Sequence, residues 1–207
     1  MFDKKCKIIF IRHGATIYNE QGRLYDIDDY PPINEKGKKE MEKISSWLKI
    51  TNPNIDMIYS SSALRSIQSS RIIAKNFKKD FEILDNLYER RAGIWGGMTF
   101  KQIEEKYPEM LQAYHKNPSN FWPEGGEATI ILQKRVKETL DSVVKKNIQK
   151  KILIISHAGI IQSAISMAVG IPLEYQARVY IPTGSATQIN YYAEWSSLVF
   201  SGYLPLQ

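Results

Sequence analysis

The sequence predicts an α/β fold in which a mostly parallel central sheet is covered by helices on both faces. Short apolar, β-branched runs at residues 7–11, 56–59, 81–84 and 151–155 are typical of strands, and they lack the alternation of a half-exposed strand. Helical patterns lie between these runs, and a sheet built from alternating strands and helices is mostly parallel. Two further strand-like runs near the carboxyl end predict an added hairpin.

Each expected helix has a recognisable signal in the sequence. Asn34 is suited to cap a helix after the first strand, and a second helix is expected over residues 62–76. A third helix, over about residues 128–146, is followed by a fourth over residues 158–169, which ends before Gly170. The inward face of the first helix is expected to carry Met41, Ile44, Trp47 and Leu48. The third helix repeats Ile131, Leu132, Arg135, Val136, Thr139, Leu140, Val143 and Val144 at helical spacing, and its Ile, Leu and Val side chains are expected in the core.

One domain spanning residues 1–207 is expected, with an insertion at about residues 85–127. The insertion contains "RRAGIWGGMTF", a possible capping box at residues 99–102, and "KNPSNFWPEGGEA", so glycine, proline and aromatic residues dominate both of its ends. A long segment of this kind after a core strand is more often a lid or binding loop than a core element. We therefore expect the insertion to form a helical and loop region over the active site. The terminal hairpin is expected over residues 188–192 and 198–203.

The composition is typical of a globular protein and argues against a membrane protein. Of the 207 residues, 43% are hydrophobic, but the longest apolar stretches are far below the roughly 20 residues that a membrane span needs. No secretory signal pattern opens the chain, and its single cysteine, Cys6, cannot form an internal disulfide. We therefore expect a cytoplasmic location and no membrane association.

The net charge of +6 does not indicate nucleic-acid binding, because the lysines occur in mixed stretches such as residues 35–43. The sequence contains no nucleic-acid motif and no basic stripe interleaved with aromatic residues. A mildly positive field instead favours a small anionic substrate.

Polar residues suited to phosphate chemistry follow the predicted strands. Arg12 and His13 follow the first strand, Arg65 and Glu89 come after the second and third, and His157 follows the last. Ligands bind beyond the carboxyl ends of parallel strands, where we expect these side chains to meet. Guanidinium groups hold phosphate oxygens, a neutral imidazole can attack phosphorus, and a carboxylic acid can protonate the leaving oxygen. Without an acidic cluster for Mg²⁺ or a Cys and His cluster for Zn²⁺, the interpretation is a phosphoryl transfer to histidine that uses no metal and no cofactor.

Five separated blocks resemble the signature of one family. In order they are "RHGATIYNEQGR", "SSALRSIQSSRIIA", "LYERRAGIWGG", "PEGGEA" and "SHAG". They are similar to the blocks of the histidine phosphatase superfamily, the phosphoglycerate-mutase-like proteins, and the resemblance spans about residues 7–190. It implies that His13 is the phosphorylated nucleophile, that Glu89 is the proton donor that later activates water, and that His157 completes the catalytic set. The phosphate ligands that it implies are Arg12, Arg65, Asn19 and the backbone near Gly159.

Some positions keep open roles or depart from the family pattern. Glu127 matches the acidic residue of the family's "GGE" block, yet a carboxylate in the first turn of a helix has a structural reading as well. Arg90 and Arg91 are open between substrate contact and surface salt bridges. Ala15 stands where the family usually has Glu or Gln, and Ala128 where it has Ser, which puts substrate preference in doubt rather than the reaction class.

The expected activity is hydrolysis of a small phosphorylated metabolite. Residues 107–127 are more similar to the phosphatase branch, which includes broad-specificity phosphatases and α-ribazole phosphatases, than to the longer mutases. The alternatives are a phosphoglycerate mutase and an inactive protein that binds a phosphorylated ligand. The oligomeric state is left open, although the run "ATQINYY" is a candidate exposed edge. The aromatic residues that could line a substrate pocket are Tyr107, Tyr114, Phe121 and Trp122.

Overall fold

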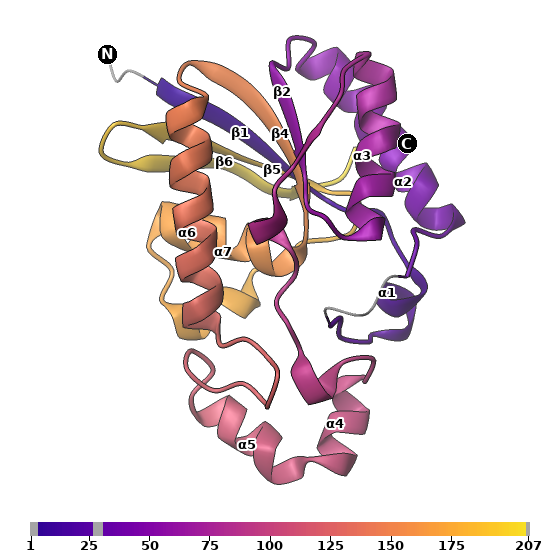
Figure 1. Cartoon of the computed structure of the whole chain (residues 1–207), viewed down its shortest axis with the longest axis vertical. Helices are drawn as coiled ribbons and strands as arrows, with labels where there is room; N and C mark the ends of the chain where they lie inside the picture. The colour runs from indigo at the N-terminus through magenta and orange to yellow at the C-terminus, as the bar shows by residue number, and fades with distance from the viewer. Residues whose placement is uncertain (1–3, 27–30, 206–207) are drawn as a thin grey trace.

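The computed structural model describes residues 4–26 and 31–205, and its centre is a six-stranded sheet of order β3-β2-β4-β1-β5-β6 (Figure 1). Neighbouring strands from β3 to β1 are parallel, whereas β5 runs antiparallel to both β1 and β6. The predicted α/β class with a mostly parallel sheet and a terminal hairpin is thus confirmed. The strands are β1 (Lys4–Arg12), β2 (Met57–Ser60), β3 (Glu82–Ile83), β4 (Lys150–Ser156), β5 (Ala186–Tyr192) and β6 (Ser196–Tyr203).

Two helices cover each face of the sheet (Figure 1). Helices α6 (Thr129–Lys146) and α7 (Ala158–Val169) pack on the face that receives Ile8 and Phe10 of β1. Helices α2 (Glu35–Thr51) and α3 (Leu64–Phe77) pack on the other face, which receives Ile9 and Ile11. Successive side chains of a strand point to opposite faces, so this continuous apolar run supplies both halves of the core.

The predicted helix signals act as expected. The side chain of Asn34 accepts a hydrogen bond from the N–H of Gly37 (2.9 Å) and begins α2. Thr99 and Gln102 form the predicted capping box of α4 (Phe100–Lys106). Gly170 ends α7 in the left-handed conformation, at φ 73°.

Residues 85–127, the insertion segment, form a group of helices below the sheet in Figure 1. Helices α4 and α5 (Pro108–Lys116) surround Trp95, whose indole packs edge-on against Tyr114 and Trp122 at ring-centroid distances of 5.9 and 5.3 Å. The segment also returns to its starting point, because Ala92 and Gly126 form an antiparallel bridge. The remaining short helices of the described chain are α1 (Ile17–Gln21), η1 (Asp85–Leu87), η2 (Gly93–Trp95) and η3 (Leu173–Arg178).

Three sequence-based expectations are wrong in detail. Strand β3 is an edge strand of two residues, Glu82 and Ile83, and both are exposed rather than buried. Ile131 is 52% exposed although Leu132, the next residue of α6, is fully buried, so Ile131 lies outside the buried stripe of the helix. The run "ATQINYY" is β5 and lies between β1 and β6, so the edge on that side is β6.

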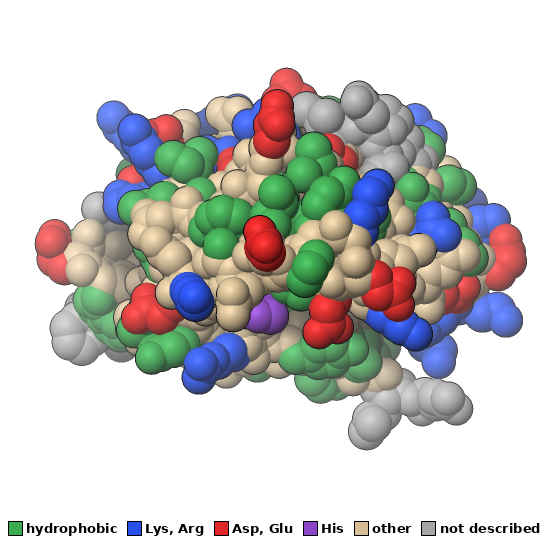
Figure 2. Space-filling view, turned by 90° about the horizontal axis from the view of Figure 1, so that it is seen from below, with side chains coloured by type: hydrophobic (Ala, Val, Ile, Leu, Met, Phe, Trp, Pro, Cys, Tyr) green, Lys and Arg blue, Asp and Glu red, His purple; other side chains and the backbone are tan. Residues whose placement is uncertain are grey.

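The surface of the insertion segment carries charges of both signs. Figure 2 looks at the molecule from this side and shows Lys and Arg side chains interspersed with Asp and Glu side chains around an apolar area. No basic stripe lies on this face within the part of the chain that the structure describes. Over residues 4–26 and 31–205, no helix has the length and apolarity needed to cross a membrane.

Candidate active site

The carboxyl ends of β1 and β4 bring His13 and His157 together. The two strands pair in parallel with Arg12 opposite Ser156, so the next residue of each strand is a histidine. The N–H of His13 donates to the carbonyl of Ser156 (3.0 Å), and the two imidazole centroids lie 5.2 Å apart. Both histidine side chains are fully buried.

The environment of His13 fixes its tautomer. Nδ1 lies 2.9 Å from the carbonyl oxygen of Gly14, and a carbonyl oxygen only accepts, so Nδ1 carries the proton. Nε2 has no hydrogen-bond partner among the described residues. Burial, followed by the charges of Arg65 and Arg12, lowers the pKa of His13 well below its usual value. His13 is therefore neutral near pH 7, with an unprotonated Nε2.

His157 is held by serine hydroxyls from α3 and the turn before it. Its Nε2 lies 2.8 Å from Oγ of Ser61 and 3.4 Å from Oγ of Ser66. Its Nδ1 has no partner within residues 4–26 and 31–205. Burial, followed by the charge of Arg65, lowers the pKa of His157 well below its usual value.

Arg12 and Arg65 place two guanidinium groups beside the imidazoles. Nη1 of Arg12 donates to the carbonyl of Ile181 (2.6 Å), which fixes the direction of the side chain. The guanidinium of Arg65 lies 3.8 Å from the ring centroid of Tyr25, and the residue is 3% exposed. Both charges contribute to the low pKa of each imidazole. The structure thus gathers four of the predicted residues around one point.

Asn19 lies on α1 and lines a cavity of about 210 Å³ together with Arg12. Its Oδ1 accepts hydrogen bonds from the N–H of Thr16 (3.0 Å) and from the hydroxyl of Tyr25 (2.9 Å). The amide oxygen is therefore occupied, which leaves the Nδ2 group as the donor of this side chain. Tyr25 in turn packs edge-on against His13, with ring centroids 5.9 Å apart.

Glu89 lies between this cavity and a second one of about 220 Å³, and lines both. Its Oε1 accepts hydrogen bonds from the N–H groups of Arg90 (2.8 Å) and Gly159 (3.2 Å). A Cβ at Gly159 would lie 2.6 Å from this oxygen, so the carboxylate needs a glycine there. The N–H of Gly159 is thus donated to Glu89, which differs from the phosphate-binding role expected for it.

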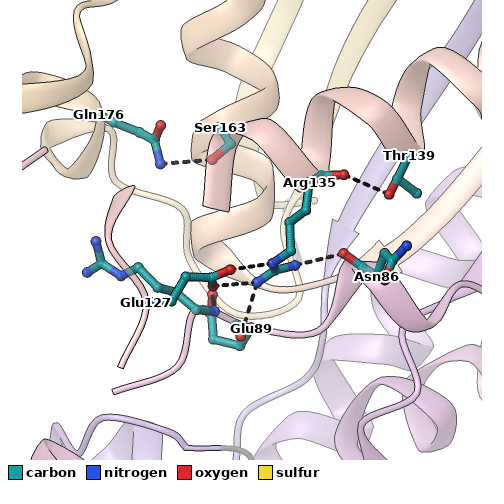
Figure 3. Close-up of polar contacts among 8 residues, drawn as sticks. Asn86, Glu89, Glu127, Arg135, Thr139, Ser163 and Gln176 are labelled. Atoms are coloured by element: carbon teal, nitrogen blue, oxygen red, sulfur yellow. Dashed lines mark hydrogen bonds and ion pairs between the residues drawn. The ribbon is translucent and has the colours of Figure 1, made fainter. Parts of the chain in front are cut away.

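Glu127 forms an ion pair with Arg135 of α6 (Figure 3). Nε and Nη2 of Arg135 donate to Oε1 and Oε2 of Glu127 at 2.6 and 2.7 Å. Nη1 donates to the carbonyl of Asn86 (2.7 Å), and Nη2 also lies 3.4 Å from the carbonyl of Glu89. The role that the sequence left open for Glu127 is therefore a structural contact to the segment that carries Glu89.

Sequence reasoning gave no role to Tyr25, Ser61 or Ser69, which the structure places around the histidines. Oγ of Ser69 accepts from the N–H of Gly14 (3.0 Å) and donates to the carbonyl of Arg65 (2.7 Å). Both serines belong to the block "SSALRSIQSSRIIA", and Ser69 lies one helical turn after Arg65. The spacing between Arg65 and Ser69 could have identified Ser69 as a residue near the site. Tyr25 lies after α1, and no sequence pattern indicates that it contacts the histidines.

Ala15, the first departure from the family pattern, is 1% exposed. Its N–H donates to Oε2 of Glu40 (2.8 Å), whose Oε1 accepts from the hydroxyl of Thr183 (3.0 Å). A carboxylate therefore reaches this backbone from α2 rather than from within the "RHGAT" block. Ala128, the second departure, is the N-cap of α6 and forms no side-chain cap.

The insertion segment supplies part of the first cavity's wall. Tyr114, Trp122 and Arg90 line this cavity, and the guanidinium of Arg90 lies 3.9 Å from the ring centroid of Trp122. Arg91 does not line either of the two cavities in the described structure. The other aromatic candidates, Tyr107 and Phe121, pack against the core of the insertion segment.

Comparisons with known proteins place this chain in one family. The sequence pattern of the histidine phosphatase superfamily (branch 1) matches residues 8–201. Phosphoserine phosphatase 1 of Hydrogenobacter thermophilus is 28% identical over 169 residues, which cover 81% of this chain and 78% of that protein. The metal-independent phosphoserine phosphatase of Arabidopsis thaliana is 28% identical over 159 residues, covering 76% and 66% of the two chains. The fold of the α-ribazole phosphatase from Shigella flexneri is similar, with a TM-score of 0.84 over 97% of this chain and 99% of that one, at 20% identity.

Proposed function

This chain belongs to the histidine phosphatase superfamily, as its five sequence blocks predicted, and from that membership we propose that it is a metal-independent phosphomonoester hydrolase. One observation carries the proposal: two buried neutral imidazoles 5.2 Å apart, one with an unprotonated Nε2, beside two guanidinium groups. This set binds a phosphoryl dianion and attacks it without a metal ion.

In the first step, Nε2 of His13 attacks phosphorus and the ester P–O bond breaks. Protonated Glu89 gives its proton to the departing oxygen, so an alcohol leaves and phosphohistidine forms. Arg12 and Arg65 stabilise the negative charge on the non-bridging oxygens. Asn19 supports this charge through its Nδ2 donor, since its oxygen is already occupied.

His157 acts as a neutral donor to the phosphoryl group. The hydroxyl of Ser61 accepts from the N–H of Ala63 (3.4 Å) and donates to Nε2 of His157 (2.8 Å). Nδ1 of His157 then carries the proton and donates to a phosphoryl oxygen.

In the second step, water attacks the phosphohistidine. The carboxylate of Glu89 takes a proton from this water, the P–N bond to His13 breaks, and inorganic phosphate leaves. Glu89 is then protonated and His13 neutral, so the enzyme is ready for another cycle.

The substrate is a small phosphorylated metabolite, and the insertion segment covers it. The first cavity, of about 210 Å³, offers Gln162 and Arg90 as polar contacts and Trp122 as an aromatic wall. Phosphoserine is the first compound to test, because two of the relatives act on it.

We also assign the protein to the cytoplasm. Cys6 is a free thiol, which is usual for cysteines in a reducing compartment. Burial raises the pKa of this thiol to about 11, which keeps it protonated and unreactive.

The experiment is a substrate screen with EDTA present. Phosphate release is measured from p-nitrophenyl phosphate, phosphoserine and 3-phosphoglycerate, for the native protein and for His13→Asn. Acid-labile, alkali-stable phosphate is expected on the native protein after rapid quenching, and none on His13→Asn. The mechanism fails if the variant keeps its activity, and metal independence fails if EDTA abolishes turnover.

The same screen tests the two alternatives. Conversion of 3-phosphoglycerate to 2-phosphoglycerate faster than its hydrolysis would identify a mutase. Binding of phosphate esters by the native protein without turnover of any of them would identify an inactive binding protein.

A further inference from the structure

Glu127 and Arg135 form an ion pair that sits largely out of water. The Glu127 side chain is 1% exposed and the Arg135 side chain 13%, and two short hydrogen bonds join them. Removing two charges from water is costly, so stability alone is a poor reason for such a pair. Its other contacts indicate what it holds.

Within the described residues, the other hydrogen bonds and the ring contact of the Arg135 side chain fall on residues 86–89. One guanidinium nitrogen donates to the carbonyl of Asn86 (2.7 Å), and another lies 3.4 Å from the carbonyl of Glu89. Between them, the guanidinium lies 3.8 Å from the ring centroid of Tyr88. Figure 3 shows this side chain reaching from α6 across to the loop.

Glu127 holds the same loop on the far side of Glu89. Its N–H donates to the carbonyl of Arg91 (3.0 Å). The guanidinium of Arg135 thus holds the main chain at residues 86 and 89, and the backbone of its partner Glu127 holds it at residue 91. No strand or helix of the described chain includes residues 88–91, so regular secondary structure does not fix the main chain around Glu89.

We propose that the Glu127–Arg135 pair is a positioning device that sets the main chain beneath Glu89, so that its carboxyl group reaches the oxygen that leaves with the alcohol. This inference rests on the proposed function of Glu89 as proton donor. Arg135 lines neither described cavity, so it does not touch the substrate. Its effect passes through the loop, and it is specific for the step in which the proton moves from Glu89 to the leaving oxygen.

Leaving-group dependence separates this role from a general structural one. An alkyl alcohol leaves slowly unless it is protonated, whereas p-nitrophenolate leaves without a proton. The value of kcat/KM reports only the steps up to phosphohistidine formation, so the later use of Glu89 as a base does not enter. A misplaced Glu89 is therefore expected to lower kcat/KM for an alkyl ester and to leave kcat/KM for the aryl ester nearly unchanged.

The test compares kcat/KM for phosphoserine and p-nitrophenyl phosphate in Arg135→Met, Arg135→Lys and Glu127→Gln. We expect Arg135→Met to lower kcat/KM for phosphoserine about 10- to 100-fold and that for p-nitrophenyl phosphate less than about threefold. Arg135→Lys keeps the charge but loses the planar guanidinium with its several N–H donors. We expect it to restore less than half of the drop in log kcat/KM for phosphoserine that Arg135→Met causes. If phosphoserine is not turned over, the most active alkyl ester of the screen replaces it.

The matched control is Lys137→Met, which removes an exposed ion pair with Asp141 (2.6 Å) on the same helix. It is expected to change neither kcat/KM. If Arg135→Met does not fold, Glu127→Gln keeps the shape of the pair and carries the same expectation. Equal losses on both esters, or no loss on either, would overturn the positioning role.

Failure of this inference is distinguishable from failure of the proposed function. Quenched Arg135→Met is expected to retain phosphohistidine formed from p-nitrophenyl phosphate, because His13 is intact. If the native protein forms no phosphohistidine from any ester, the proposed mechanism fails, whereas normal phosphohistidine with equal losses refutes only the positioning role.

Discussion

Replacing Gly159 with alanine is expected to displace Glu89 while the fold stays intact. A Cβ at this position lies 2.6 Å from Oε1 of Glu89, and its next neighbours, atoms of Leu132 and Arg90, lie at ordinary contact distances of 3.5 and 3.7 Å. The carboxylate must therefore retreat by roughly 0.8 Å to reach van der Waals contact, and it leaves the N–H that now holds it.

The size of the effect follows from this displacement. Misplacing a reacting group by about 1 Å costs about 10²-fold in rate, which is within the contribution of about 10²–10⁴-fold from a general acid. We expect kcat/KM for phosphoserine to fall about 100-fold in Gly159→Ala. The free energy of unfolding is expected to change by less than about 1 kcal/mol, because the clash involves the end of a flexible side chain and alanine favours the helix.

The assay measures kcat/KM for phosphoserine together with urea unfolding. Gly170→Ala, at the other end of α7, is the matched control: its φ of 73° disfavours alanine, and nothing lies within 4 Å of the added Cβ. This control is expected to lose stability and keep its activity. A Gly159→Ala variant with native kcat/KM, or one whose loss of activity follows a loss of stability, would refute the reasoning.

Three further outcomes are expected from the same geometry. Folding lowers the pKa values of His13 and His157, so the unfolded chain binds more protons than the folded chain below about pH 6.5. As the pH decreases below this value, the free energy of unfolding is expected to fall by up to about 1.4 kcal/mol per pH unit for each histidine. Urea unfolding at pH 7 and pH 5.5, without phosphate, measures this difference in the free energy of unfolding. If His13→Asn shows the same difference between the two pH values as the native protein, the prediction is wrong. Ser61→Ala removes the 2.8 Å hydrogen bond to His157 and is expected to lower kcat/KM about tenfold and the free energy of unfolding by about 1–2 kcal/mol, and undiminished turnover would exclude this role. Gly14→Ala places a Cβ 2.4 Å from the backbone oxygen of Gly37 and is expected to lower the free energy of unfolding by about 2 kcal/mol or more. Thermal unfolding measures this loss, and a native melting temperature would show that the backbones at Gly14 and Gly37 can move apart freely.

Local patterns predicted the elements of this fold well. Strands β1, β2 and β4 and helices α2, α3, α6 and α7 follow from apolar runs, caps and helical spacing that lie within one stretch of chain. The exposure of β3 was not predictable in this way, because it depends on β3 being at the edge of the sheet. The strand order that brings β1 beside β4, and with it the two histidines together, also depends on contacts distant in sequence.

The candidate site divides in the same way. His13 and His157 were predictable because each follows an apolar strand in a family block. The donation from Gly159 to Glu89 was not, because the loop that carries Glu89 has no periodic pattern. Arg135 did carry a signal: it occupies an inward position in the apolar stripe of α6, and a charge at such a position needs a partner. That partner, Glu127, lies before the helix and is visible only in three dimensions.

The bridge between Ala92 and Gly126 brings the two ends of residues 93–125 together, and further contacts tie this stretch to Arg23 and Leu24. Because the chain leaves and re-enters the scaffold at adjacent points, a replacement of different length closes with little added entropy cost. Glu89, Glu127 and both histidines lie outside this stretch. Because Tyr114 and Trp122 of this stretch line the first cavity, we expect chimaeras that graft a relative's segment between these two points to alter substrate selectivity.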